Sequence, residues 1–170
     1  MGAGKSTIGK ELASRLNYRF IDTDLLIEER ENLSISELFQ QKGETYFRKV
    51  EREVLIEASC YDENFVMSTG GGAPCFMDNM ELLNSIGITV YLKMDANDLY
   101  NRLVSTKENS RPLLQNKSSD ELLPFISNKL TEREPFYNRS KIIISGKSVR
   151  ADRIEKNIMK FINDNPDEKG

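Results

Sequence analysis

The sequence Gly2-Ala3-Gly4-Lys5-Ser6-Thr7 (GAGKST, residues 2–7) decides the fold of this 170-residue chain. In the phosphate-binding pattern G-x-x-x-x-G-K-[ST], Gly4, Lys5 and Ser6 fill the last three places, and the first glycine would lie two residues before Met1. Glycines allow close approach of phosphates to the backbone, Lys5 can reach the β- and γ-phosphates of a nucleotide, and Ser6 can ligate Mg²⁺. The alternative is a flexible glycine-rich start to a helix. We favour a phosphate loop because an amphipathic helix follows the motif directly.

Helix and strand patterns alternate after this loop. Ile8, Leu12 and Leu16 recur every fourth residue and predict a helix with one apolar face. Strands are predicted at YRFID (18–22), NFVMST (64–69), ITVYLKM (88–94) and KIIIS (141–145). Further helices are predicted at 34–41, from 44 onward, at 96–104, after Ser118, and along the apolar stripe 154–162. Ser34 and Glu37 predict a capping box at the first of these helices, and Gly43 would suit its stop. Glu51 falls on the polar flank of the helix from 44 onward, and Ser118 can cap the helix that follows it. The alternation predicts an α/β fold with a three-layer parallel sheet, helices on both faces and ligands at the carboxyl ends of the strands.

The strand that should deliver the chain to the phosphate loop is absent from this pattern. A buried central strand normally precedes such a loop, and its loss would leave backbone groups unpaired on both neighbouring strands. We therefore expect the first, central strand to be missing from this chain and the natural chain to begin about ten residues earlier, with Met1 as an internal methionine.

Composition narrows the possible functions. The net charge is −3 and the pI is near 5.2, which argues against a broad nucleic-acid surface, and no apolar run is long enough to span a membrane. Two cysteines and no secretion signal favour the cytoplasm. With no histidine in the chain, imidazole catalysis and histidine metal sites are excluded. Carboxylates, Lys, Arg and the backbone must carry the chemistry, and we expect a monomeric single domain over residues 1–170.

Two carboxylates end the strand that follows the first helix. Asp22 and Asp24 would point the same way if the strand continued, so that Asp22 could join a magnesium shell and Asp24 could hold a substrate hydroxyl. The alternative is an ordinary turn or N-cap before a helix beginning near Leu25. The preceding phosphate loop favours the functional interpretation.

Glycines and arginines complete the set of candidates. Gly70, Gly71 and Gly72 directly follow a predicted strand and offer bare backbone to a ligand, although a tight turn is the alternative. Arg48 lies beside an apolar helix stripe and can reach a carboxylate as a bidentate fork. Arg111 lies in a polar stretch at about 105–120 that we expect to form a mobile lid over a transferred phosphoryl group. Arg133 lies near a helix end that Pro135 is expected to terminate.

Six motifs together resemble the shikimate kinase family over nearly the whole chain. They are GAGKST (2–7), DTD (22–24), GETYFRKVE (43–51), GGG (70–72), RPLL (111–114) and REPFY (133–137). The resemblance implies a P-loop kinase fold of the nucleoside-monophosphate-kinase type, with ATP and Mg²⁺, that phosphorylates the 3-hydroxyl of shikimate on the way to chorismate and aromatic amino acids.

The resemblance also implies roles for individual residues. Lys5 and Ser6 would serve MgATP, Asp22 the metal shell and Asp24 the attacking hydroxyl. Arg48 and Arg133 would clamp the shikimate carboxylate, with Gly71 binding through its backbone. Phe39 and Phe47 would line the pocket, and Arg111 would be the lid arginine facing ATP. SGKS (145–148) falls where the family places adenine contacts.

Two other functions remain open at this point. A kinase of another small hydroxy acid, such as gluconate, shares the loop and the lid, and only Asp24, Arg48, Gly71 and Arg133 separate the two. A nucleotide-binding protein without catalysis is the other, because the phosphate loop is incomplete.

Overall fold

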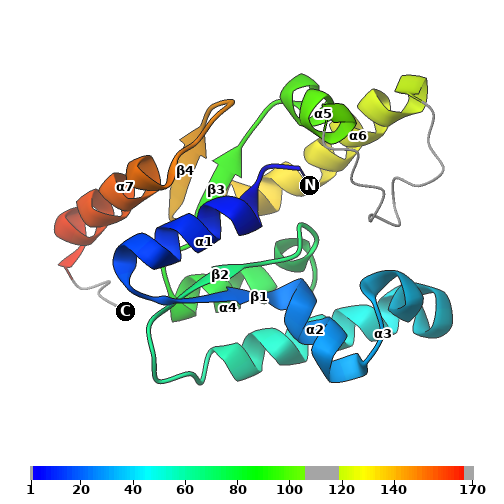
Figure 1. Ribbon diagram of the computed structural model, residues 1–170, viewed down its shortest axis with the longest axis horizontal. Coiled ribbons are helices and arrows are strands. Elements are labelled where there is room, and N and C mark those ends of the chain that lie inside the picture. The colour runs from blue at the N-terminus through cyan, green and yellow to red at the C-terminus, as the bar shows by residue number, and fades with distance from the viewer. Residues whose placement is uncertain (1, 106–118, 167–170) are drawn as a thin grey trace.

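The computed structural model describes residues 2–105 and 119–166 (Figure 1). The elements are α1 (Lys5–Leu16), β1 (Arg19–Asp22), α2 (Thr23–Glu31), α3 (Ile35–Ala58), β2 (Phe65–Ser68), the short 3-10 helix η1 (Ala73–Cys75), α4 (Asn79–Ile86), β3 (Val90–Lys93), α5 (Ala96–Ser105), α6 (Ser119–Tyr137), β4 (Ile142–Ser145) and α7 (Ala151–Asp164). The four predicted strands and the alternation of helix and strand are confirmed.

The described strands form two parallel pairs. β1 pairs with β2 so that Asp22 lies opposite Ser68, and β3 pairs with β4 so that Lys93 lies opposite Ser145. Figure 1 shows the two pairs on either side of α1. Because the strands of each pair are parallel, their carboxyl ends lie at the same edge, where the sequence predicts ligands.

The predicted parallel sheet is therefore divided. In the described part of the chain, each strand is hydrogen-bonded to one neighbour, and no strand lies between β2 and β3. This division agrees with the expectation that a central strand is missing from the sheet. Side chains bridge the two pairs, because Val66 of β2 packs against the cluster that contains Ile142 and Ile144 of β4.

Amphipathic helices cover the strands. Leu12 of α1 and Ile154 of α7 are buried in one cluster with the β4 side chains, as the spacing of their apolar residues predicts. A second cluster joins α2 to α3 around Ile27 and Leu38, which are fully buried. None of the described helices is long and apolar enough to cross a membrane.

The helix α3 combines two predicted segments. Ser34 and Glu37 form the expected capping box at its start. Gly43 interrupts the helix with φ of 80° and ψ of 171°, values outside the helical region, so the predicted stop is confirmed as a kink within one longer element. The kink separates the segment that carries Phe39 from the segment that carries Arg48.

Three expectations need correction or fall outside the described residues. Pro135 does not terminate its helix, because α6 continues to Tyr137 with Pro124 and Pro135 inside it. The helix α4 had no counterpart in the predictions from sequence. The lid expected at about 105–120 and Ser118, the predicted cap, fall mostly or wholly outside the described residues.

Candidate functional site

The phosphate loop lies at the start of α1. Gly2 and Gly4 have φ of 70° and 78°, in the left-handed region that glycine adopts at little cost. Gly4 is the N-cap of α1 and has no side chain to cap the helix. The first-turn N–H groups, including those of Lys5 and Ser6, are thus placed as an anion-binding helix terminus, while Ala3 and Thr7 flank them.

Polar side chains gather at the carboxyl ends of β1 and β2. The Ser6 hydroxyl donates to Asp22 Oδ2 at 2.7 Å and lies 3.3 Å from the Ser68 hydroxyl. The buried Thr23 hydroxyl accepts from the Gly70 N–H at 3.2 Å, which ties the end of β1 to the residues after β2. Ser6 and Asp22 therefore present two hard oxygen ligands side by side, which suits Mg²⁺ that keeps several waters.

The aspartate pair does not continue the strand. Asp22 is the N-cap of α2, and its side chain accepts from the Asp24 N–H at 3.1 Å, so the N-cap alternative describes the backbone correctly. The two carboxylates nevertheless lie next to different parts of the site. Asp22 contacts Ser6, whereas a Cβ placed on Gly70 would meet Asp24 Oδ1 at 3.0 Å. Asp24 is exposed, so a ligand at the glycine run can reach it.

The glycine run 70–72 lies next to three of the predicted substrate-binding residues, Asp24, Arg133 and Arg48. Gly70 faces Asp24, and the Gly71 carbonyl accepts from Arg133 Nη1 at 3.3 Å. A Cβ on Gly72 would lie 2.7 Å from Arg48 Nη2, so the guanidinium lies directly against this Cα. Three consecutive glycines thus each approach a different candidate. A single tight turn would not require this, and the absence of Cβ atoms is what allows the close approach.

Arg48 is nearly buried and held from several sides. Its side chain is 11% exposed, and its guanidinium carbon lies 3.8 Å from the centroid of the Phe76 ring. Nη1 donates to Glu51 at 2.7 Å, and Nη2 donates to Glu44 at 3.0 Å. These contacts fix the planar fork in the geometry that carboxylate recognition needs.

Glu51 is a site residue that sequence reasoning placed on a polar helix flank. It is 1% exposed, and its Oε1 has no hydrogen-bond partner among the described residues. Burial raises the pKa of Glu51, the Arg48 charge opposes this rise, and Asp24 adds to it. The i,i+3 spacing of Arg48 and Glu51 was the signal that could have found it.

Burial also raises the pKa of the nearby Cys75 thiol, although the charges of Arg133 and Arg48 act in the opposite direction.

Phe47 is buried in the α2–α3 core, and its ring centroid lies 4.6 Å from that of Phe39. The Phe47 ring centroid also lies 5.0 Å from the Arg48 guanidinium carbon, so this aromatic pair packs next to the candidate site.

Two further arginines, Arg111 and Arg102, concern the region around the phosphate loop. Arg111 lies outside the described residues. Arg102 of α5 was not singled out from sequence, yet it donates to the backbone carbonyls of Ala3, at 3.3 Å, and of Lys147. It thereby links the phosphate loop to the 145–148 segment. No signal in the sequence distinguishes this arginine from surface arginines.

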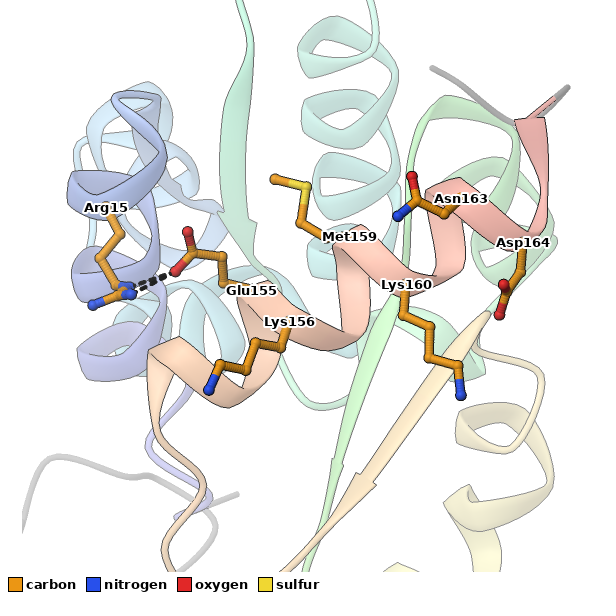
Figure 2. A pocket seen from close by; sticks show the side chains of 7 residues that line it. All are labelled: Arg15, Glu155, Lys156, Met159, Lys160, Asn163 and Asp164. Carbon is orange, nitrogen blue, oxygen red and sulfur yellow. Dashed lines mark hydrogen bonds and ion pairs between the residues drawn. The ribbon is translucent and has the colours of Figure 1, made fainter.

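One hollow lies away from these residues. It measures about 530 Å³ and lies between α1 and α7 (Figure 2), lined by Arg15, Glu155, Lys156, Met159, Lys160, Asn163 and Asp164. Arg15 and Glu155 pair across it at 2.6 Å. The hollow shares no residue with the candidate site.

Comparisons with known proteins place this geometry in context. A family model described as shikimate kinase matches residues 1–163. A shikimate kinase of Azobacteroides pseudotrichonymphae is 46% identical over 159 residues, which cover 94% of this chain and 93% of that protein. A shikimate kinase of Bacteroides fragilis is 50% identical over 143 residues, covering 84% and 79%.

Solved structures agree with the sequence relatives. The crystal structure of shikimate kinase from Bacteroides thetaiotaomicron matches with a TM-score of 0.87 and 42% identity, covering 96% of this chain and 94% of that one. The Acinetobacter baumannii enzyme, solved in complex with shikimate, matches with a TM-score of 0.81 and 34% identity, covering 97% and 89%.

Proposed function

The chain belongs to the shikimate kinase family of ATP-dependent kinases that act on an alcohol group, and we propose that its glycine run 70–72 is where shikimate meets Asp24, Arg48 and Arg133. The supporting observation is that each of three consecutive glycines approaches a different one of these side chains. A carboxylate and two guanidinium groups around bare backbone suit a small hydroxy acid.

The carboxylate of shikimate would bind between the two arginines. Arg48 already donates to Glu44, which is 56% exposed, and to the buried Glu51. The exposed Glu44 can rotate into solvent when a substrate carboxylate arrives, whereas Glu51 keeps holding the guanidinium. Arg133 reaches the same place from α6 and would supply the second fork.

Phosphoryl transfer requires alignment and stabilisation of negative charge rather than covalent catalysis. Asp24 would orient the 3-hydroxyl and accept its proton. Lys5 and the first-turn N–H groups of α1 would bind the terminal phosphates of ATP, and Arg111, which lies outside the described residues, would add a further positive charge.

Mg²⁺ would be held by Ser6 and Asp22. Their 2.7 Å contact brings a hydroxyl and a carboxylate together, and one carboxylate with waters and phosphate oxygens is a usual shell for this ion. No group of three or more His, Cys, Asp or Glu side chains that could hold a metal ion occurs among residues 2–105 and 119–166. When bound, the ion neutralises charge on the β- and γ-phosphates. We also propose that the protein is cytoplasmic and acts as a monomeric single domain.

A coupled ATP-consumption assay on the full chain tests the activity. ADP formation is measured with shikimate and with gluconate in parallel, and shikimate 3-phosphate is detected by mass spectrometry. We expect turnover with shikimate alone, and none in Lys5→Ala. Turnover with gluconate but not shikimate would reassign the substrate. Binding of MgATP by calorimetry without turnover of either would indicate a nucleotide-binding protein without catalysis.

A further inference from the structure

Tyr137, in the last turn of α6, contacts the glycine run. Its hydroxyl donates to the Gly71 carbonyl, which also accepts from Arg133 Nη1 at 3.3 Å. Tyr137 and Arg133 are four residues apart and therefore lie on the same face of the helix. One carbonyl oxygen is thus held by two donors from one helix, which are 62 and 66 residues away in the sequence.

The environment of Tyr137 keeps its hydroxyl a donor. Burial raises the pKa of Tyr137, although the Arg133 charge acts in the opposite direction. Its ring centroid lies 5.0 Å from that of Tyr91, at an interplanar angle of 42°. Burial and the charge of Glu134 raise the pKa of Tyr91 to about 12. Both phenols are therefore neutral near pH 7, and the aromatic contact fixes the direction of the Tyr137 hydroxyl.

Holding the Gly71 carbonyl fixes the peptide that joins Gly71 to Gly72. The described chain contains no cis peptide, so the Gly71 carbonyl and the Gly72 N–H point in opposite directions. The Gly72 Cα in turn lies against the Arg48 guanidinium. A rotation of this peptide would therefore disturb Arg48 and Arg133 together, although neither arginine would lose a charge.

We propose that Tyr137 is a positioning residue for acceptor binding, acting through the Gly71–Gly72 peptide. This inference rests on the proposed function of the glycine run. A substrate carboxylate that binds Arg133 can draw the guanidinium away from its 3.3 Å contact with the Gly71 carbonyl. Tyr137 then remains as the donor that keeps the peptide, and with it Arg48, in place.

The test compares Tyr137→Phe with Tyr91→Phe. Each variant removes one hydroxyl from the same aromatic pair, and no hydrogen bond of the Tyr91 hydroxyl is found among the described residues. We expect Tyr137→Phe to raise the KM for shikimate about tenfold, with kcat and the KM for ATP within about twofold. Tyr91→Phe should leave all three constants within about twofold. Both variants should melt within a few degrees of the unsubstituted chain.

A second replacement separates positioning from packing. Para-aminophenylalanine at position 137 restores a donor at the ring's para position and should return the shikimate KM to within about threefold of the unsubstituted value. Failure of this rescue would overturn the inference, as would an equal rise of KM in Tyr91→Phe or a fall in kcat without any change in KM.

The proposed function is judged separately in the same series. Arg48→Lys is measured alongside the tyrosine variants. If Arg48→Lys raises the shikimate KM and Tyr137→Phe does not, the positioning role is wrong and the acceptor site stands. If neither substitution changes the shikimate KM of an active enzyme, the acceptor site itself is wrong.

Discussion

The two ends of the proposed site, the nucleotide end at the phosphate loop and the acceptor end at the glycine run, are built in different ways. The phosphate loop consists of consecutive residues, with left-handed Gly2 and Gly4 leading into the N-terminus of α1. The acceptor end consists of side chains from α2, α3 and α6 around one glycine run, and its Gly71–Arg133 contact spans 62 residues. Local backbone geometry thus prepares the first region, whereas the second depends on how distant elements pack.

The two regions also differ in how their charges are satisfied. The N-terminus of α1 has no side-chain cap, so it is open to a phosphate. Arg48 is already paired with Glu44 and Glu51, so a substrate must replace an existing partner. Changes at the acceptor end should therefore alter kcat or the KM for shikimate and leave the KM for ATP nearly unchanged.

The largest expected effect is that of Asp24→Asn. This substitution keeps the shape of the side chain but removes the carboxylate that, in the proposed function, accepts the hydroxyl proton. We expect kcat to fall about 10²- to 10⁴-fold while the KM for ATP changes little. Steady-state kinetics with both substrates measure this, with the exposed Asp62→Asn as control. An unchanged kcat would remove Asp24 from this role and break the division between the two ends.

A smaller effect is expected from Arg48→Lys. Lysine keeps the charge but loses the planar fork, so the KM for shikimate should rise about tenfold with the KM for ATP unchanged. Arg30→Lys is a matched control, because Arg30 also pairs with two glutamates of α3, Glu53 and Glu57, and lies outside the candidate site. Equal effects of the two substitutions would show that the kinetics report general destabilisation.

Gly72→Ala tests how closely the backbone at the acceptor end must fit the Arg48 guanidinium. The new Cβ would meet Arg48 Nη2 at 2.7 Å, and the flexible arginine must shift to make room. We expect the KM for shikimate to rise about fivefold while the melting temperature stays nearly unchanged. The reason is that displacing the Arg48 guanidinium by about 0.5 Å weakens its alignment with the substrate carboxylate. Gly87→Ala is the control, since nothing lies within 4 Å of its Cβ position. A shikimate KM that stays constant would mean that Arg48 tolerates displacement.

The smallest effect concerns stability and pH. The raised pKa of Glu51 means that the folded protein binds this proton more tightly than the unfolded chain does, whose ordinary value is 4.5. The associated stability is complete below that value and is lost as pH rises through the raised folded pKa. Relative to Glu51→Gln, the unsubstituted chain should therefore lose melting temperature as pH rises from about 4 to about 7.

Melting curves of both proteins over this range provide the measurement, with Glu29→Gln on the surface of α2 as control. Parallel curves for the unsubstituted chain and Glu51→Gln would mean that Arg48 fully compensates the buried carboxylate.

The sequence was sufficient for the parts of the molecule that depend on neighbouring residues. The four strands and the capping box of Ser34 and Glu37 follow from local patterns and are confirmed. The helix stop expected at Gly43 occurs as a kink within α3. The family is confirmed as well, because its motifs occur in order along the chain. The individual site roles, including those of Phe39 and Phe47, stay predictions.

The remaining features depend on packing between distant segments. The burial of Glu51 arises where α3 meets the glycine run, and the i,i+3 spacing from Arg48 indicates an ion pair but not this burial. The contacts of Arg102 and Tyr137 likewise join segments far apart in sequence. Pro135 fails to stop α6 because a proline removes one donor without preventing the next residues from completing a turn.

The environment of Cys75 has a practical consequence for labelling. Its raised pKa leaves little thiolate near neutral pH, even though two arginines are close by. Cys60 is exposed at the end of α3, away from the glycine run. A maleimide fluorophore should therefore attach first at Cys60, which gives this chain a reporter handle that spares the acceptor site without any cysteine replacement.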